Sequence, residues 1–94
     1  MMEAQTELLQ NIEKAIRDVL NNPTLNIGLE SKLVDDLGLE SIDMLDVSSE
    51  LENSIGRELD FKEVAEFVKN KNGAQANIKS VSVKDLIDFI ETTH

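Results

Sequence analysis

Apolar side chains recur every three or four residues in several separate segments of this chain, and this spacing limits its fold more than any other feature. The spacing matches the turn of an α-helix, about 3.6 residues, and not the alternation of a strand. The clearest segment runs from about Thr6 to Leu20, and its apolar members are Leu8, Leu9, Ile12, Ala15, Ile16, Val19 and Leu20. Asn21, Asn22 and Pro23 follow and are expected to end this helix.

Two more helices are expected in the middle of the chain. One runs from about Ser41 to Ile55, with an apolar row through Val47 and Leu51, and Gly56 is a suitable stop for it. The next is short and carries Phe61, Val64, Ala65 and Val68. It is expected to close before residues 70–77, which have the composition of a loop.

A final helix is expected to start at Ser82. Ser82 and Asp85 have the spacing of a capping box, with Asp in place of the usual Glu or Gln. The buried stripe of this helix consists of Val83, Leu86, Ile87 and Ile90, and Phe89 is expected at the edge of that stripe.

The helical period is lost in residues 24–40, where leucines are spread among glycines and polar residues, so a long loop held down by its leucines is expected there. No segment shows the alternation and hairpin turns of paired strands. The fold class is therefore all-α. We expect a small four-helix bundle of three longer helices and one short helix, with the long loop between the first two. At 94 residues, the chain suits a single domain, 1–94.

The chain is strongly acidic, with 19 Asp and Glu against 9 Lys and Arg and a formal net charge of -10. This charge argues against binding nucleic acid or an anionic membrane, and it favours basic protein surfaces as partners. The acid is concentrated in residues 35–60, where Arg57 is the one basic residue. Such a run is often only a solvated face, and this plain interpretation stands beside a partner-binding one.

Two absences restrict the chemistry. The chain has no cysteine, and its one histidine is His94, which we expect to be a frayed terminus without a role. No calcium-binding loop pattern occurs, and no metal site is expected.

The first residues, MMEAQTELLQ, are acidic and amphipathic, unlike a signal peptide, so we expect a cytoplasmic protein without membrane insertion.

Ser41 stands where the long loop gives way to a helix. On position alone it is most simply an N-cap, whose hydroxyl accepts a free backbone N–H for about 1 kcal/mol. A helix N-terminus is also a favourable place for a phosphate, so a phosphodiester on this serine is physically reasonable. No base lies nearby in sequence to activate the hydroxyl, so an outside enzyme would have to modify it.

The run Asp36-Leu37-Gly38-Leu39-Glu40-Ser41-Ile42-Asp43 resembles the signature Asp-Leu-Gly-x-Asp-Ser-Leu-Asp of acyl carrier proteins. The resemblance extends along the next helix, through Leu45, Val47, Leu51, Glu52 and Ile55, and to the closing segment 82–90, so it covers nearly the whole chain. It implies that Ser41 receives 4'-phosphopantetheine from coenzyme A, delivered by a phosphopantetheinyl transferase. The protein would then hold acyl intermediates as thioesters and present them to enzymes of fatty acid, polyketide or related lipid biosynthesis. It implies a carrier and not an enzyme, and we expect a monomer.

The resemblance also implies a partner-binding face, which would meet basic patches on the transferase and on acyl-handling synthases. Its residues are Asp36, Glu40, Ile42, Asp43, Leu45, Asp46, Ser49 and Glu52. Periodicity alone allows Ile42 and Leu45 to be core residues, but we expect Leu45 to be exposed as a small dry contact beside Ser41.

Several positions depart from the pattern of the family. Glu40 and Ile42 replace the commoner Asp and Leu on either side of the serine, which bears on the choice of transferase. Ser48 and Ser49 stand at positions that are usually apolar, one facing the core and one facing partners, so the acyl cavity is expected to be more polar or differently shaped. The connection 61–81 is longer than usual, which indicates a specialised member.

Two other functions compete with acyl transfer. One is a carrier of aminoacyl or peptidyl groups, which the strong acidity disfavours. The other is an acidic docking module that binds partners without covalent modification and uses Ser41 only as a cap. Catalysis by the chain itself lacks a base near Ser41 and any metal cluster.

Overall fold

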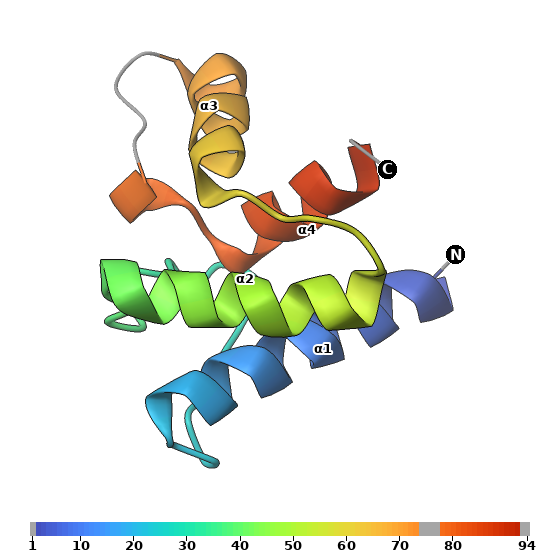
Figure 1. Cartoon of the computed structure of the whole chain (residues 1–94). Helices are drawn as coiled ribbons and strands as arrows, with labels where there is room; N and C mark the ends of the chain where they lie inside the picture. Colours follow the sequence, from blue (N-terminus) through green and yellow to red (C-terminus); the bar gives the residue numbers. More distant parts are fainter. Residues whose placement is uncertain (1, 74–77, 93–94) are drawn as a thin grey trace.

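The computed structural model describes residues 2–73 and 78–92, and these form an all-α bundle without a named strand (Figure 1). Its helices are α1 (Met2–Leu20), α2 (Ser41–Ile55), α3 (Phe61–Asn72) and α4 (Val83–Thr92), with a short 3-10 helix, η1 (Ile78–Ser80), before α4. A contact between Lys32 and Ser82 is an isolated β-bridge. The expected fold class is therefore confirmed, and no helix in these ranges is long and apolar enough to cross a membrane.

The helix bounds agree with the sequence in part. Helix α2 has the expected bounds, whereas α1 begins at Met2, one turn before the expected Thr6. Helix α3 was expected to close before residue 70, but it continues to Asn72 and has 12 residues. The shortest α-helix among the described residues is consequently α4, with 10 residues, and not the third helix.

The ends of the helices follow local chemistry. Gly56 has φ of 75° and donates its N–H to the carbonyl of Glu52 at 2.9 Å, which ends α2 with a left-handed residue. At the start of α4 the expected capping box is present. The N–H of Asp85 donates to the hydroxyl of Ser82, and the N–H of Ser82 donates to the carboxylate of Asp85, both at 3.1 Å.

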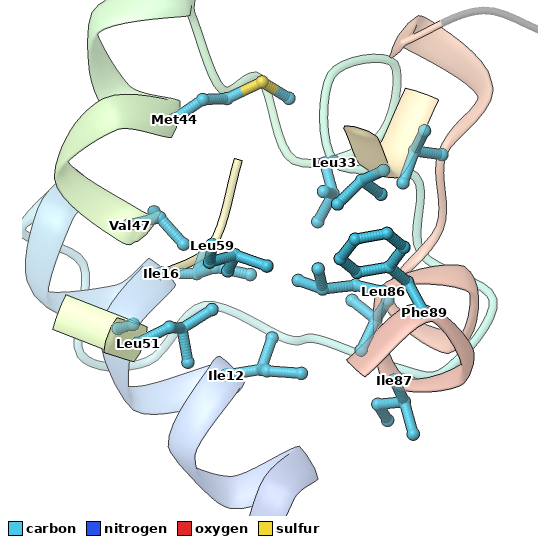
Figure 2. Close-up of a cluster of buried hydrophobic side chains, with 14 of the residues drawn as sticks. Ile12, Ile16, Leu33, Met44, Val47, Leu51, Leu59, Leu86, Ile87 and Phe89 are labelled. Carbon is cyan, nitrogen blue, oxygen red and sulfur yellow. The ribbon is translucent and has the colours of Figure 1, made fainter. Parts of the chain in front are cut away.

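The hydrophobic core lies where α1, α2 and α4 converge, and the long loop closes it (Figure 2). Each element contributes side chains that are almost fully buried, among them Ile12 and Ile16 from α1, Val47 and Leu51 from α2, Leu86 and Ile87 from α4, and Leu33 from the loop. Burial of these apolar groups is the main term that stabilises so small a domain.

Phe89 is part of this core. The spacing in the sequence had predicted that it would lie at the edge of the buried stripe, so that prediction was wrong. Phe89 is 5% exposed, and its ring meets that of Phe67 at a centroid distance of 5.6 Å and an angle of 76°, an edge-to-face contact. Lys71 lies over the Phe67 ring and forms ion pairs with Asp88 and Asp85 at 2.7 Å and 3.7 Å. These contacts hold the last turn of α3 against α4, which explains why α3 is longer than expected.

The loop of residues 21–40 is fixed both by buried side chains and through its backbone. Three hydrogen bonds of 2.9 Å join it to the segment entering α4: Leu33 N–H to Val81, Val83 N–H to Ser31, and Lys84 N–H to Leu29. Leu33 and Leu39 are buried as expected, whereas Leu29 is 43% exposed and does not hold the loop down. Because Leu39 also donates its N–H to the Leu33 carbonyl, the chain reaches α2 from a fixed point.

Candidate functional site

Ser41 is the first residue of α2 and is exposed. It is not the N-cap, which corrects the simplest interpretation of its position. Glu40 occupies the cap with extended backbone angles, and the carboxylate of Asp43 accepts the Glu40 N–H at 3.0 Å. The Glu-x-x-Asp spacing of Glu40 and Asp43 is the sequence signal that could have identified this cap.

Because Glu40 is the N-cap, Ser41 lies exposed on the first turn of α2. Backbone N–H groups of such a turn and the positive end of the helix dipole favour an attached phosphate. The nearby carboxylates of Glu40 and Asp43 oppose this effect. Since Ser41 is exposed on this turn, its hydroxyl is accessible to another enzyme and is a suitable place for a phosphodiester.

Two large apolar side chains flank Ser41 on the outer surface of α2. Ile42 is 66% exposed and Leu45 is 69% exposed, so neither is a core residue. Asp46 and Ser49 are also exposed on this helix, and Asp36 and Glu40 are exposed just before it. The structure therefore brings together an exposed face of mixed character, apolar beside the serine and acidic around it.

Asp43 is half-buried, and two further residues on α2 lie differently from this face. Glu52 was expected on the partner-binding face, but it is half-buried and its carboxylate accepts the N–H of Leu59 at 2.9 Å. Ser48 is 8% exposed and donates its hydroxyl to the carbonyl of Leu45 at 2.9 Å, so it faces inward as the resemblance implied.

A cavity of about 580 Å³ begins at Ser41 and lies between α2 and the start of α3. Its α2 wall consists of Ser41, Met44, Leu45, Ser48 and Glu52, and its opposite wall consists of Leu59, Asp60, Phe61, Lys62 and Ala65. The sequence did not indicate this second wall, because it depends on the path that the chain takes from the end of α2 into α3. The side chain of Met44, in the upper part of Figure 2, reaches inward from α2.

No group of His, Cys, Asp or Glu able to hold a metal ion occurs in residues 2–73 and 78–92. His94 lies outside the described residues, as do residues 74–77 of the lengthened connection. The site is thus defined by the serine, the exposed face of α2 and the cavity.

Comparison with known proteins decides the family. Residues 10–70, which include Ser41 and all of α2, match the family described as "Phosphopantetheine attachment site". The chain belongs to this family. A curated acyl carrier protein of Thermotoga maritima is 25% identical over 91 residues, spanning 96% of this chain and 95% of that relative. The chain is accordingly a carrier protein and not an enzyme, and its cofactor is 4'-phosphopantetheine.

Proposed function

We propose that Ser41 carries the 4'-phosphopantetheine group and that the chain, as one carrier domain of residues 1–94, presents acyl groups to partner enzymes. The observation that carries this proposal is the position of Ser41. Ser41 is exposed on the first turn of α2, Glu40 takes the role of cap, and the serine lies within the run 36–43, inside the matched range.

A separate transferase must carry out the attachment. The chain has no cysteine, and its one histidine is the terminal His94, so a catalytic base is supplied by the transferase. The Ser41 oxygen forms a new bond to phosphorus, the diphosphate bond of coenzyme A breaks, the adenosine bisphosphate leaves, and the hydroxyl proton passes to that base. The attached group then supplies the thiol that this cysteine-free chain lacks.

The residues around Ser41 support an acyl cargo. Half of the residues in the cavity wall are apolar, including Met44, Leu59 and Phe61, and they supply most of its surface, so the cavity offers an alkyl chain an escape from water. The name of the Thermotoga maritima relative points the same way. We place the function in fatty acid, polyketide or related lipid synthesis in the cytoplasm, and we infer a monomer.

The exposed face of α2 serves as the docking surface in this proposal. Ile42 and Leu45 provide the small dry contact, while Asp36, Glu40, Asp43 and Asp46 attract basic patches on the transferase and synthases. Ser49 adds a polar contact. Surface charges of this kind speed the encounter and keep the complexes short-lived, which suits a carrier that visits several enzymes.

The proposal is tested by incubating variants with coenzyme A and a broad-specificity phosphopantetheinyl transferase, then measuring intact masses. Wild type and the control Ser54→Ala, which changes an exposed serine of the same helix outside the docking surface, should both gain one phosphopantetheine group. Ser41→Ala should gain none while its melting temperature stays close to that of wild type. Modification of Ser41→Ala would place the attachment elsewhere.

A further inference from the structure

Lys62 is the one basic residue in the wall of the cavity that begins at Ser41. In Figure 1 the segment after α2 runs back along that helix before α3 begins. Asp60 is the N-cap of α3, so Lys62 lies on the first turn of this helix. Ser41 lies on the first turn of α2 and lines the same cavity. The fold thus places a lysine across one cavity from the proposed attachment serine.

The local structure of α3 does not account for a lysine at this position. A positive charge on the first turn of a helix lies near the positive end of the helix dipole and is unfavourable there. Glu66 lies one turn further along, but lysine before glutamate is the less favourable order for such a pair. In the part of the chain that the structure describes, Lys14 and Lys71 pair with carboxylates, whereas Lys62 forms no ion pair. The exposed Lys62 is therefore available to an added anion.

Attachment of 4'-phosphopantetheine to Ser41 brings such an anion, because the phosphodiester is ionised at neutral pH. The carboxylates of Glu52 and Asp60 belong to the cavity wall and oppose a further negative charge there. Each of them accepts a backbone N–H, at 2.9 Å and 2.8 Å respectively, but neither bond supplies a cation. Lys62 is the member of the wall whose charge can offset this repulsion.

We propose that Lys62 forms an ion pair with the phosphodiester that joins 4'-phosphopantetheine to Ser41, and so holds the base of the arm on the α3 side of the serine. The inference rests on the proposed function, since without attachment at Ser41 there is no phosphate to bind. Lys62 is then a positioning residue. Because the ion pair is exposed, it is weak and sensitive to salt, which lets the arm leave for the active site of a partner.

The first test measures the reactivity of single lysines on the whole protein, with and without the cofactor attached. Both forms are treated with a trace of acetic anhydride, and peptide mass spectrometry gives the acetylation rate of each lysine. Attachment at Ser41 should slow the acetylation of Lys62 about 1.5- to 5-fold, the factor expected of an exposed ion pair, because pairing favours the protonated and unreactive amine. Lys69, an exposed lysine further along α3 and outside the cavity wall, should react equally fast in both forms.

Salt distinguishes an ion pair from simple coverage by the arm. In about 1 M sodium chloride an exposed ion pair is largely screened, so the acetylation rates of Lys62 in the two forms should converge. Slow acetylation that persists at this salt concentration would show that the arm only covers the side chain, and it would reject the ion pair.

Variants of the modified protein give a second readout, at the phosphate itself. Phosphorus NMR resolves the resonance of the phosphodiester on Ser41. Lys62→Gln should shift this resonance, whereas Lys62→Arg keeps the positive charge and should stay close to wild type. The matched control Lys69→Gln removes a neighbouring charge of the same helix and should leave the resonance unchanged. Melting temperatures establish that all three variants are folded.

The outcomes distinguish this inference from the proposed function. A protein that gains no phosphopantetheine group at Ser41 would reject both together. Modification at Ser41 with an unchanged acetylation rate at Lys62, or with an equal slowing at Lys69, would reject the inference alone. A phosphorus resonance in Lys62→Gln that coincides with that of wild type would also reject it, because the phosphate would then not sense the lysine.

Discussion

The carboxylate of Asp43 accepts the backbone N–H of Glu40 at 3.0 Å, and this contact closes the first turn of α2 around Ser41. The same carboxylate lies near the positive end of the helix dipole, where a negative charge is favourable. Asp43 therefore has a structural role at the site, in addition to any contact with partners.

Replacing Asp43 by Ala should lower the free energy of unfolding by about 1 kcal/mol, because the cap loses its acceptor and the dipole loses a compensating charge. Urea unfolding followed by circular dichroism measures this change. Asp43→Asn keeps an acceptor of similar shape and should lose less. Equal losses in the two variants would show that the hydrogen bond is unimportant and that only the charge matters.

The apolar part of the docking face predicts a defect in recognition without a defect in folding. Leu45→Ser should lower kcat/KM for modification by the transferase about fivefold or more, since truncating a hot-spot residue near the centre of an interface costs more than about 1 kcal/mol. Its unfolding free energy should change little because Leu45 is 69% exposed. The control is Leu29→Ser, which changes an exposed leucine outside α2; an equal effect there would contradict a specific face.

The burial of Phe89 predicts a large effect on stability. Phe89→Ala removes a core side chain and its edge-to-face contact, and it should cost roughly 3–5 kcal/mol, a large share of the stability of a domain of this size. Phe67→Ala should cost less because Phe67 is only half-buried. Thermal and urea unfolding compare the two, and a milder effect at Phe89 would argue against the packing of α3 on α4.

The ion pairs of Lys71 should make the stability of the protein depend on pH at high pH. Its hydrogen bond to Asp88 raises the pKa of Lys71 above the ordinary 10.5, the charges of Asp88 and Asp85 add to this shift, and burial opposes it. A raised folded-state pKa means that the stabilisation is complete at neutral pH and is lost as pH rises through the shifted value.

The difference in melting temperature between wild type and Lys71→Met should therefore be constant from neutral pH to about pH 9 and should shrink above about pH 10.5. The effect should be small because the side chain is 41% exposed. A difference that stays constant across this range would assign the contribution of Lys71 to its packing on Phe67.

The sequence predicted local features well and tertiary ones poorly. The bounds of α2 and the capping box at Ser82 follow from residues close together in the chain, so both could be predicted. The extension of α3 to Asn72 depends on Lys71 meeting α4, and the burial of Phe89 depends on Phe67, contacts that no local pattern contains.

The same distinction applies to the candidate site. Ser41 could be selected from its surrounding run of residues, and the resemblance placed Ser48 on the inner face. The expectation that Ser41 is the cap was wrong because the Glu40–Asp43 pair takes that role. Residues within 59–65 line the cavity opposite α2, and the Leu59 N–H donates to the Glu52 carboxylate. Both features depend on the path of the chain after α2, which no local pattern contains.

The central claim is that one serine carries the cofactor, and peptide fragmentation mass spectrometry of the wild-type protein tests it most directly. After incubation with coenzyme A and an active transferase, the account predicts a single phosphopantetheine group on the peptide that contains Ser41, at Ser41 itself. A group on another serine would contradict the assignment of the site. Folded protein that stays unmodified by every transferase tried would contradict the carrier role and favour the docking module.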